Sequence, residues 1–380
     1  MLNKISRFLF GNKIETNQVL EPKVDLLIEQ IKSSDVNSSS AINEFFTSIK
    51  DVGHPEYPIL DKLYSPNAIE KISSLVKNTL DKKSTSMLRE HHKIRKNFEK
   101  RHYKLWEKGL NLLETFIVIS YESGEDLNKS LRDEAAENND YVFDALTRLH
   151  ARSIQVAYEV LLLLERGFAD GAHARWRTIH EISVVSLFIK KHGQDIAERY
   201  LLHEIIESYK AILQYQIYCD KLNQPPLSVG EMDEIISKRD ELVLKYGKDF
   251  CDEYGWTSSI LPKSHNFSDI EKESGLEHLR PYYKMASYNV HANPKGIKFK
   301  LGLTEEVERI LLSGPSNYGL ADPAHGTTLS LLQITSALLT HKTNMDNLVV
   351  LKILSAYEKE IADAFIEVNN IMKSKIVSAC

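Results

Sequence analysis

Apolar residues recur every three or four positions through most of the chain, and this spacing predicts amphipathic helices. Serine as a cap followed by proline starts a helix near 66–80. An apolar helix is predicted at 110–121, and the acidic stretch 133–140 marks a break. Three longer helices are predicted at 141–166, 168–192 and 196–222. Because short turns at Gly167 and Gly193 join them, we expect these three helices to pack as antiparallel neighbours.

Proline, glycine and capping residues divide the second half of the chain. A charged helix is predicted at 229–246, after a pair of prolines. Ser268 and Glu271 have the spacing of a capping box, which predicts a short helix ending at Gly275. Another helix should open at Pro281 and close at Asn293. A short strand at 295–303 and a long helix from about 327 to about 375, interrupted near 341–347, complete the prediction.

These elements predict an all-α fold, a helical bundle of long antiparallel helices with an N-terminal helical extension. Short helical patterns at 24–31 and 41–49 belong to the extension. We therefore divide the chain into an N-terminal helical region, 1–135, and a bundle core domain, 136–380, which carries the candidate site.

Charge and cysteine usage narrow the class of protein. The chain has 380 residues, with 53 acidic and 48 basic side chains, so its net charge of -5 argues against non-specific coating of nucleic acid or an anionic membrane. Three scattered cysteines show no Cys-x-x-Cys pair, and no apolar run reaches the length of a membrane span. We expect a cytoplasmic protein that needs no cofactor and has no membrane partner.

One segment departs from this acidic average. Residues 82–108 contain ten Lys and Arg against three Glu, together with three histidines. Two interpretations stay open: a helix that faces RNA or phosphate, and a solvated helix whose charge keeps the protein soluble. Glu99 and His102 have the Glu-x-x-His spacing of di-iron bundles, but the second copy and the further carboxylates are missing, so we expect no metal.

A cluster of polar residues begins the predicted helix 168–192. On an α-helix, His173, Arg177, His180 and Glu181 share one face, whereas Arg175 points nearly opposite. Arg177 and Glu181 are four residues apart on a largely apolar helix, so they form either a structural ion pair or a site where Glu181 orients Arg177 toward an anionic group. His180 beside them is a candidate for proton transfer near neutral pH.

A second polar line lies on the predicted helix from Pro281. Tyr283, Ser287 and His291 follow one another at steps of four residues. His291 in the last turn either interacts with the free carbonyl groups there or acts as a general acid, with Ser287 or Tyr283 positioning a substrate. We count Tyr283 and Lys284, together with His173, as candidate substrate-binding residues. The sequence shows no Gly-x-Ser-x-Gly elbow, phosphate loop or dinucleotide fingerprint.

The run from Gly167 to Glu181 and the motifs His192-Gly, Ala197-Glu-Arg-Tyr200 and Ser287-x-x-x-His291 resemble the bacterial domain-of-unknown-function family 5677 over roughly residues 140–300. The resemblance maps the family's arginine and glutamate onto Arg177 and Glu181, and its serine and histidine onto Ser287 and His291. It implies no activity.

More distantly, Arg175 to His180 has the Arg-x4-His spacing of HEPN-type helical ribonucleases, many of which are toxins or phage-defence effectors. Trp176 departs from the polar residue usual after that arginine, and an ideal helix separates Arg175 from His180 by about 140°. A bulge, a helix start between the two residues or a site shared by a homodimer would be needed to bring them together.

The HEPN resemblance implies metal-independent RNA cleavage, in which a histidine moves protons and an arginine stabilises the phosphorus centre. The candidate catalytic residues are Arg175, Arg177, His180, Glu181, Ser287 and His291. The alternative is a non-catalytic helical binding module in which Arg177 and Glu181 are purely structural.

Overall fold

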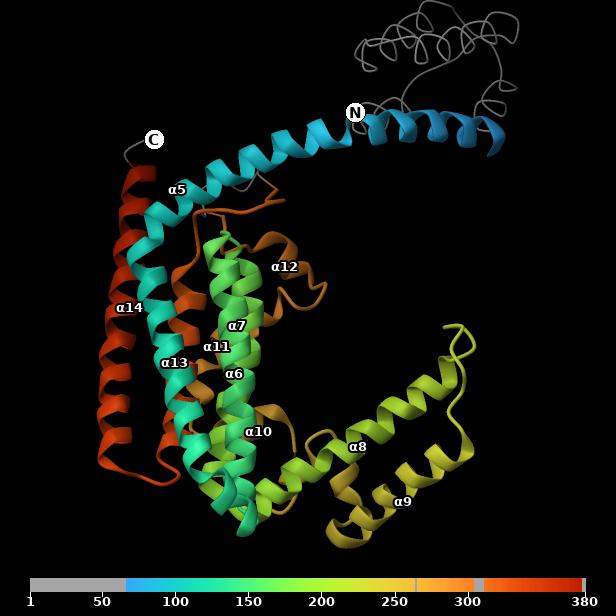
Figure 1. The fold of residues 1–380 in the computed structure, drawn as a ribbon, viewed down its shortest axis with the longest axis vertical. Helices are drawn as coiled ribbons and strands as arrows, with labels where there is room; N and C mark the ends of the chain where they lie inside the picture. The colour runs from blue at the N-terminus through green and yellow to red at the C-terminus, as the bar shows by residue number, and fades with distance from the viewer. Residues whose placement is uncertain (1–65, 264, 304–310, 378–380) are drawn as a thin grey trace, which may run out of the picture. The chain divides into compact units, whose positions relative to one another are not determined.

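The computed structural model describes residues 66–263, 265–303 and 311–377. The helices predicted at 24–31 and 41–49 lie outside these residues. The fold is all-α, as predicted, and the described residues contain no strand. Its α-helices are α5 (Pro66–Glu137), α6 (Tyr141–Glu165), α7 (Ala169–His192), α8 (Gln194–Tyr218), α9 (Val229–Tyr246), α10 (Phe267–Glu273), α11 (Arg280–Ser287), α12 (Pro294–Lys298), α13 (Ala321–Leu339) and α14 (Met345–Val377) (Figure 1).

The segments predicted at 66–80, 82–108 and 110–121 join into the single 72-residue helix α5. It ends at Glu137, where Asn139 adopts φ +50° and Asp140 caps α6, so the predicted break is confirmed. Packing divides the chain inside α5, between Lys96 and Asn97. Residues 97–137 thus belong to the same compact unit as the helices that follow.

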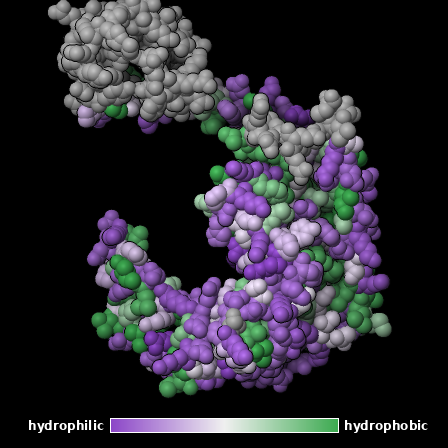
Figure 2. Space-filling view, turned by 180° about the vertical axis from the view of Figure 1, so that it is seen from behind, coloured by the Kyte–Doolittle hydropathy of each residue, from purple (hydrophilic) through white to green (hydrophobic). Residues whose placement is uncertain are grey.

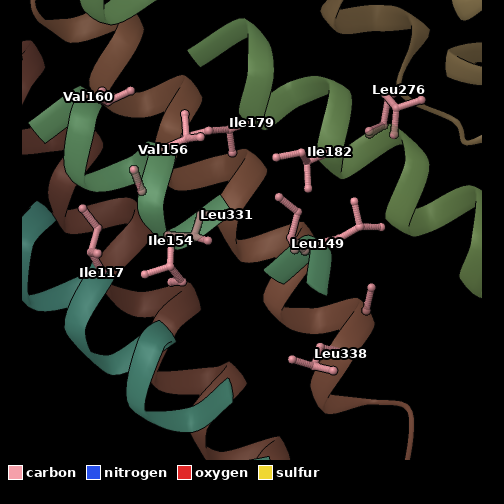
Figure 3. Close-up of a cluster of buried hydrophobic side chains, with 14 of the residues drawn as sticks. Ile117, Leu149, Ile154, Val156, Val160, Ile179, Ile182, Leu276, Leu331 and Leu338 are labelled. Carbon is pink, nitrogen blue, oxygen red and sulfur yellow. The ribbon is translucent and has the colours of Figure 1, made fainter. Parts of the chain in front are cut away.

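The bundle of this unit consists of α6, α7, α13, α14 and the second half of α5 (Figure 1). Its core is filled by aliphatic side chains from different helices, as Figure 3 shows for Ile117, Val156, Ile179 and Leu331. Each fully buried side chain of this kind stabilises the fold by about 1.5–3 kcal/mol. This apolar contact holds α7 against α6 and α13 and thereby fixes which side chains of α7 remain at the surface.

Helices α6 and α7 lie alongside each other as predicted, but only the first half of α8 packs on them. The buried residues of α8 end at Ile206, and its second half leaves the bundle and pairs with α9 (Figure 1). Apolar side chains such as Ile217, Leu222 and Val229 stay exposed as a result. In Figure 2 the projecting pair of α8 and α9 carries hydrophobic patches among its hydrophilic residues.

Three local predictions in the second half were wrong. The cap of α10 is Asn266, whose side chain accepts from the amide of Asp269, and Glu271 is buried instead of closing a capping box on Ser268. Helix α11 ends at Ser287 and continues as turns, so it does not reach Asn293. Residues 294–298 form α12, where a strand was predicted.

Close packing explains the early end of α11. Gly296 of α12 lies so near the carbonyl group of Tyr288 that a Cβ atom would come within 2.1 Å of the oxygen. Because only glycine allows this approach, the chain can fold back at 288–293 and place His291 in a surface turn. Helix α13 begins at Ala321, earlier than predicted, and the interruption before α14 falls at 340–344.

Candidate functional site

Helix α7 carries polar residues that are buried and others that are partly exposed, and His173 is one of the buried ones. His173 is almost fully buried, stacks on Trp176 with ring centres 5.2 Å apart, and has its pKa lowered to about 4 by burial. Trp176 in turn donates to Ser330 of α13 at 3.2 Å. His173 is therefore neutral at neutral pH and belongs to the contact between helices rather than to the surface, where we had expected it to bind substrate.

Arg177 and Glu181 lie at the edge of this buried face, with 23% and 37% of their side chains exposed. Arg177 Nε donates to Glu181 Oε1 at 3.0 Å, and the hydroxyl of Tyr283 on α11 donates to the same oxygen at 2.6 Å. The Arg177 guanidinium also lies over the Tyr283 ring, 4.8 Å from its centre. Side chains separated by about a hundred residues in sequence thus form one hydrogen-bonded group.

Electrostatics favour a permanent charge on Arg177. Burial opposes that charge, but Glu181 and Tyr283 together raise the pKa of Arg177 above its ordinary value. Burial, followed by the hydrogen bond to Glu181, raises the pKa of Tyr283 well above its usual range. Tyr283 therefore stays protonated and remains a donor to the Glu181 carboxylate.

His291 joins this group from the turn after α11. Its Nε2 atom lies 3.5 Å from Nη1 of Arg177, and its side chain is exposed. Ser287 donates its hydroxyl to the backbone carbonyl group of Tyr283, and Lys284 is exposed on the same helix. The structure therefore brings Arg177, Glu181, Tyr283 and His291 together, and we call these four residues the Arg177 site.

His180 has a different environment from Arg177. It is fully buried, and its Nε2 lies 2.8 Å from Oε1 of Glu271, a carboxylate that is itself buried in α10. The other oxygen of Glu271 accepts from Nη1 of Arg280 at 2.9 Å. Since water does not reach His180, the surface that carries the Arg177 site does not include it.

Arg175 lies on the opposite side of α7 from the Arg177 site, as its helical phase predicts. It forms an ion pair with Glu159 of α6 and donates to Thr178 at 3.2 Å. Its partners differ from those of His180, which contacts α10. The structure thus does not bring Arg175 and His180 together within this chain.

The roles of Glu271, Arg280 and the aromatic residues around them did not follow from the sequence. Arg280 lies 5.4 Å from the centre of the Tyr283 ring and 5.9 Å from that of Phe267. Burial raises the pKa of Tyr254, and so does the nearby charge of Glu181. The sequence signal at Glu271 was its capping-box spacing with Ser268, which pointed to a local role.

The described residues offer no alternative based on a metal: none of them form a group of three or more His, Cys, Asp or Glu side chains suited to an ion. Glu99 and His102 do not converge, because Glu99 pairs with Arg166 while His102 contacts Asn317 and the carbonyl group of Leu164.

None of the helices in the described ranges combines the length and hydropathy that crossing a membrane requires. The Arg177 site combines a charged guanidinium with an exposed imidazole, side chains that are chemically able to bind an anionic group and to exchange a proton.

Residues 143–308 match the model of a family described as a family of unknown function (DUF5677). The matched range runs from α6 to beyond α12 and contains all four residues of the Arg177 site. No curated protein and no solved structure matches the chain. The match agrees with the resemblance noted in the sequence, and it assigns no activity.

Proposed function

We propose that the protein is a metal-independent ribonuclease in which Arg177 and His291 act on one phosphodiester. The observation that carries the proposal is the 3.5 Å separation of Arg177 Nη1 and His291 Nε2. A guanidinium provides several donors for a phosphate, and an exposed imidazole can exchange a proton with a group held beside it. Glu181 and Tyr283 supply the fixed orientation that such an arginine requires.

In the proposed reaction the ribose 2′-oxygen forms a bond to phosphorus and the bond from phosphorus to the 5′-oxygen breaks. The Glu181 carboxylate accepts the proton of the 2′-hydroxyl, and the protonated His291 gives a proton to the departing 5′-oxygen. Arg177 stabilises the extra negative charge at phosphorus. The products are a 2′,3′-cyclic phosphate and a 5′-hydroxyl end, with no change of oxidation state.

The proposal keeps the reaction class of the HEPN-type ribonucleases but assigns it to other residues than the Arg-x4-His match. A role in defence, or as a toxin, would follow from RNA cleavage in the cell. Exposed Lys100, Arg101 and Lys104 on α5 support RNA as the partner, because cations on one helix attract the phosphate backbone. The proposal needs no homodimer, because the four residues of the Arg177 site come from one chain.

A second candidate rests on the same contacts. Arg177, Glu181 and Tyr283 tie α7 to α11, and this is what a structural ion pair in a non-catalytic binding module would do. The two candidates differ at His291, because its exposed imidazole adds little to the joint between these helices but is required for proton transfer.

The test uses purified full-length protein and single-stranded RNA in the presence of a chelator. We expect wild-type protein to produce 2′,3′-cyclic phosphate ends, and His291→Ala to lower the rate by about a hundredfold or more. His278→Ala is the matched control, since His278 is also exposed and precedes α11 in a short 3-10 helix. RNA that stays intact with concentrated wild-type protein, or His291→Ala at the wild-type rate, would overturn the proposal.

A further inference from the structure

Arg280 lies beside the Arg177 site but has no part in the proton transfers above. It is the first residue of α11, and 29% of its side chain is exposed. One of its N–H groups donates to Glu271 at 2.9 Å, and its guanidinium lies 5.4 Å from the centre of the Tyr283 ring. A guanidinium carries five N–H donors, so this contact with Glu271 uses a small share of them.

Glu271 is the buried ion-pair partner of Arg280. Only 1% of its side chain is exposed, and its second oxygen contacts the fully buried His180 at 2.8 Å. A buried carboxylate requires such partners, because an unpaired charge in the protein interior is strongly destabilising. His180 and Glu271 therefore fix the direction in which the Arg280 side chain extends to the surface.

Arg177 and Arg280 share one aromatic neighbour. Their guanidinium carbons lie 4.8 and 5.4 Å from the centre of the Tyr283 ring, so they are at most about 10 Å apart. Burial raises the pKa of Tyr254, and the positive charges of both arginines lower it by a smaller amount. Two partly exposed cations held this close by separate carboxylates suit a ligand with more than one negative charge.

We propose that Arg280 is a second phosphate-binding arginine, and that Arg177 and Arg280 hold neighbouring phosphates of one RNA strand. The inference rests on the proposed function for its ligand, but it concerns binding and not cleavage. Each arginine is oriented by its own glutamate, Arg177 by Glu181 and Arg280 by Glu271. The strand then passes over Tyr283, and its scissile phosphate lies at Arg177 beside His291.

Binding is measured with a short single-stranded 2′-O-methyl oligonucleotide, which lacks the attacking hydroxyl and cannot be cleaved by this reaction. We expect Arg280→Met to weaken its affinity about tenfold, and to lower the slope of log K against log salt by about 0.7. Arg280→Lys should keep the salt slope. The matched control is Arg239→Met, because Arg239 is also 30% exposed, pairs with a carboxylate and lies 4.8 Å over a tyrosine ring.

Arg280→Met leaves the buried Glu271 with one partner fewer, so the double variant Arg280→Met with Glu271→Gln removes that charge as well. If Arg280 contacts RNA, the double variant folds and still binds weakly. Recovery of wild-type affinity in the double variant, or unchanged affinity in Arg280→Met, would show that Arg280 serves Glu271 alone and would overturn the inference. Because the oligonucleotide is uncleavable, weak binding by these variants supports the inference even if wild-type protein cleaves no RNA.

Discussion

The hydroxyl of Tyr283 donates a 2.6 Å hydrogen bond to the carboxylate of Glu181, across the contact between α11 and α7. The same oxygen of Glu181 accepts from Arg177, so the tyrosine and the arginine are aligned by one acceptor. This relationship orients the guanidinium while leaving 23% of the arginine side chain exposed. It is also the contact that a single substitution removes most cleanly.

Tyr283→Phe keeps the ring under Arg177 and deletes the hydroxyl. We expect the free energy of unfolding to fall by about 1–2 kcal/mol, because a hydrogen bond to a charged acceptor is lost in a partly exposed setting. Urea denaturation measures the change, with Tyr282→Phe as the control, since Tyr282 is its exposed neighbour. Equal midpoints for the two variants would contradict a stabilising role for the bond to Glu181.

Arg175 and Arg177 are two residues apart, and substituting each of them tests which arginine stabilises the phosphorus centre. Arg177→Ala should lower RNA cleavage by about a hundredfold, as the loss of a group that stabilises charge at phosphorus does. Arg175→Ala should cleave close to the wild-type rate and lose less than about 1 kcal/mol of stability, because its pair with Glu159 is partly exposed. The reverse order of activities would favour the Arg-x4-His interpretation.

His173 predicts a dependence of stability on pH. Burial lowers its pKa to about 4, whereas an unfolded histidine titrates near its ordinary value of about 6.5. The unfolded chain thus binds more protons between these values, so this contribution is fully present above about pH 6.5 and is lost as the pH falls toward 4. The loss approaches about 3 kcal/mol.

The measurement compares urea denaturation at pH 7 and pH 5 for wild type and His173→Phe, whose ring can still stack on Trp176. In the variant the free energy of unfolding should depend less steeply on pH, because about one proton fewer is taken up on unfolding. Part of the wild-type dependence remains, because His150 is also buried and has its pKa lowered to about 4. His278→Phe, at an exposed position, should leave the dependence unchanged. An unaltered slope in His173→Phe would show that His173 is not buried as a neutral group.

Local patterns were sufficient to place helices α6 and α7. The apolar spacing and the glycines at 167 and 193 placed α6 and α7 within a few residues, because helix periodicity and chain reversal depend on near neighbours. The same periodicity paired Arg177 with Glu181 and separated Arg175 from both. Those relationships follow from the geometry of one helix and need no partner.

Tertiary structure decided everything that depends on contacts between distant elements. Glu271 has the spacing of a cap, but the packing of α10 on α7 buries it against His180, 91 residues earlier. Arg280 gained its place from that buried carboxylate, and His291 met Arg177 because α11 ends at Ser287 and the chain folds back. The sequence by itself determined the helices and the pairs within them; which polar side chains are enclosed and which reach the surface was decided by how the helices pack, since burial is a property of the assembled core.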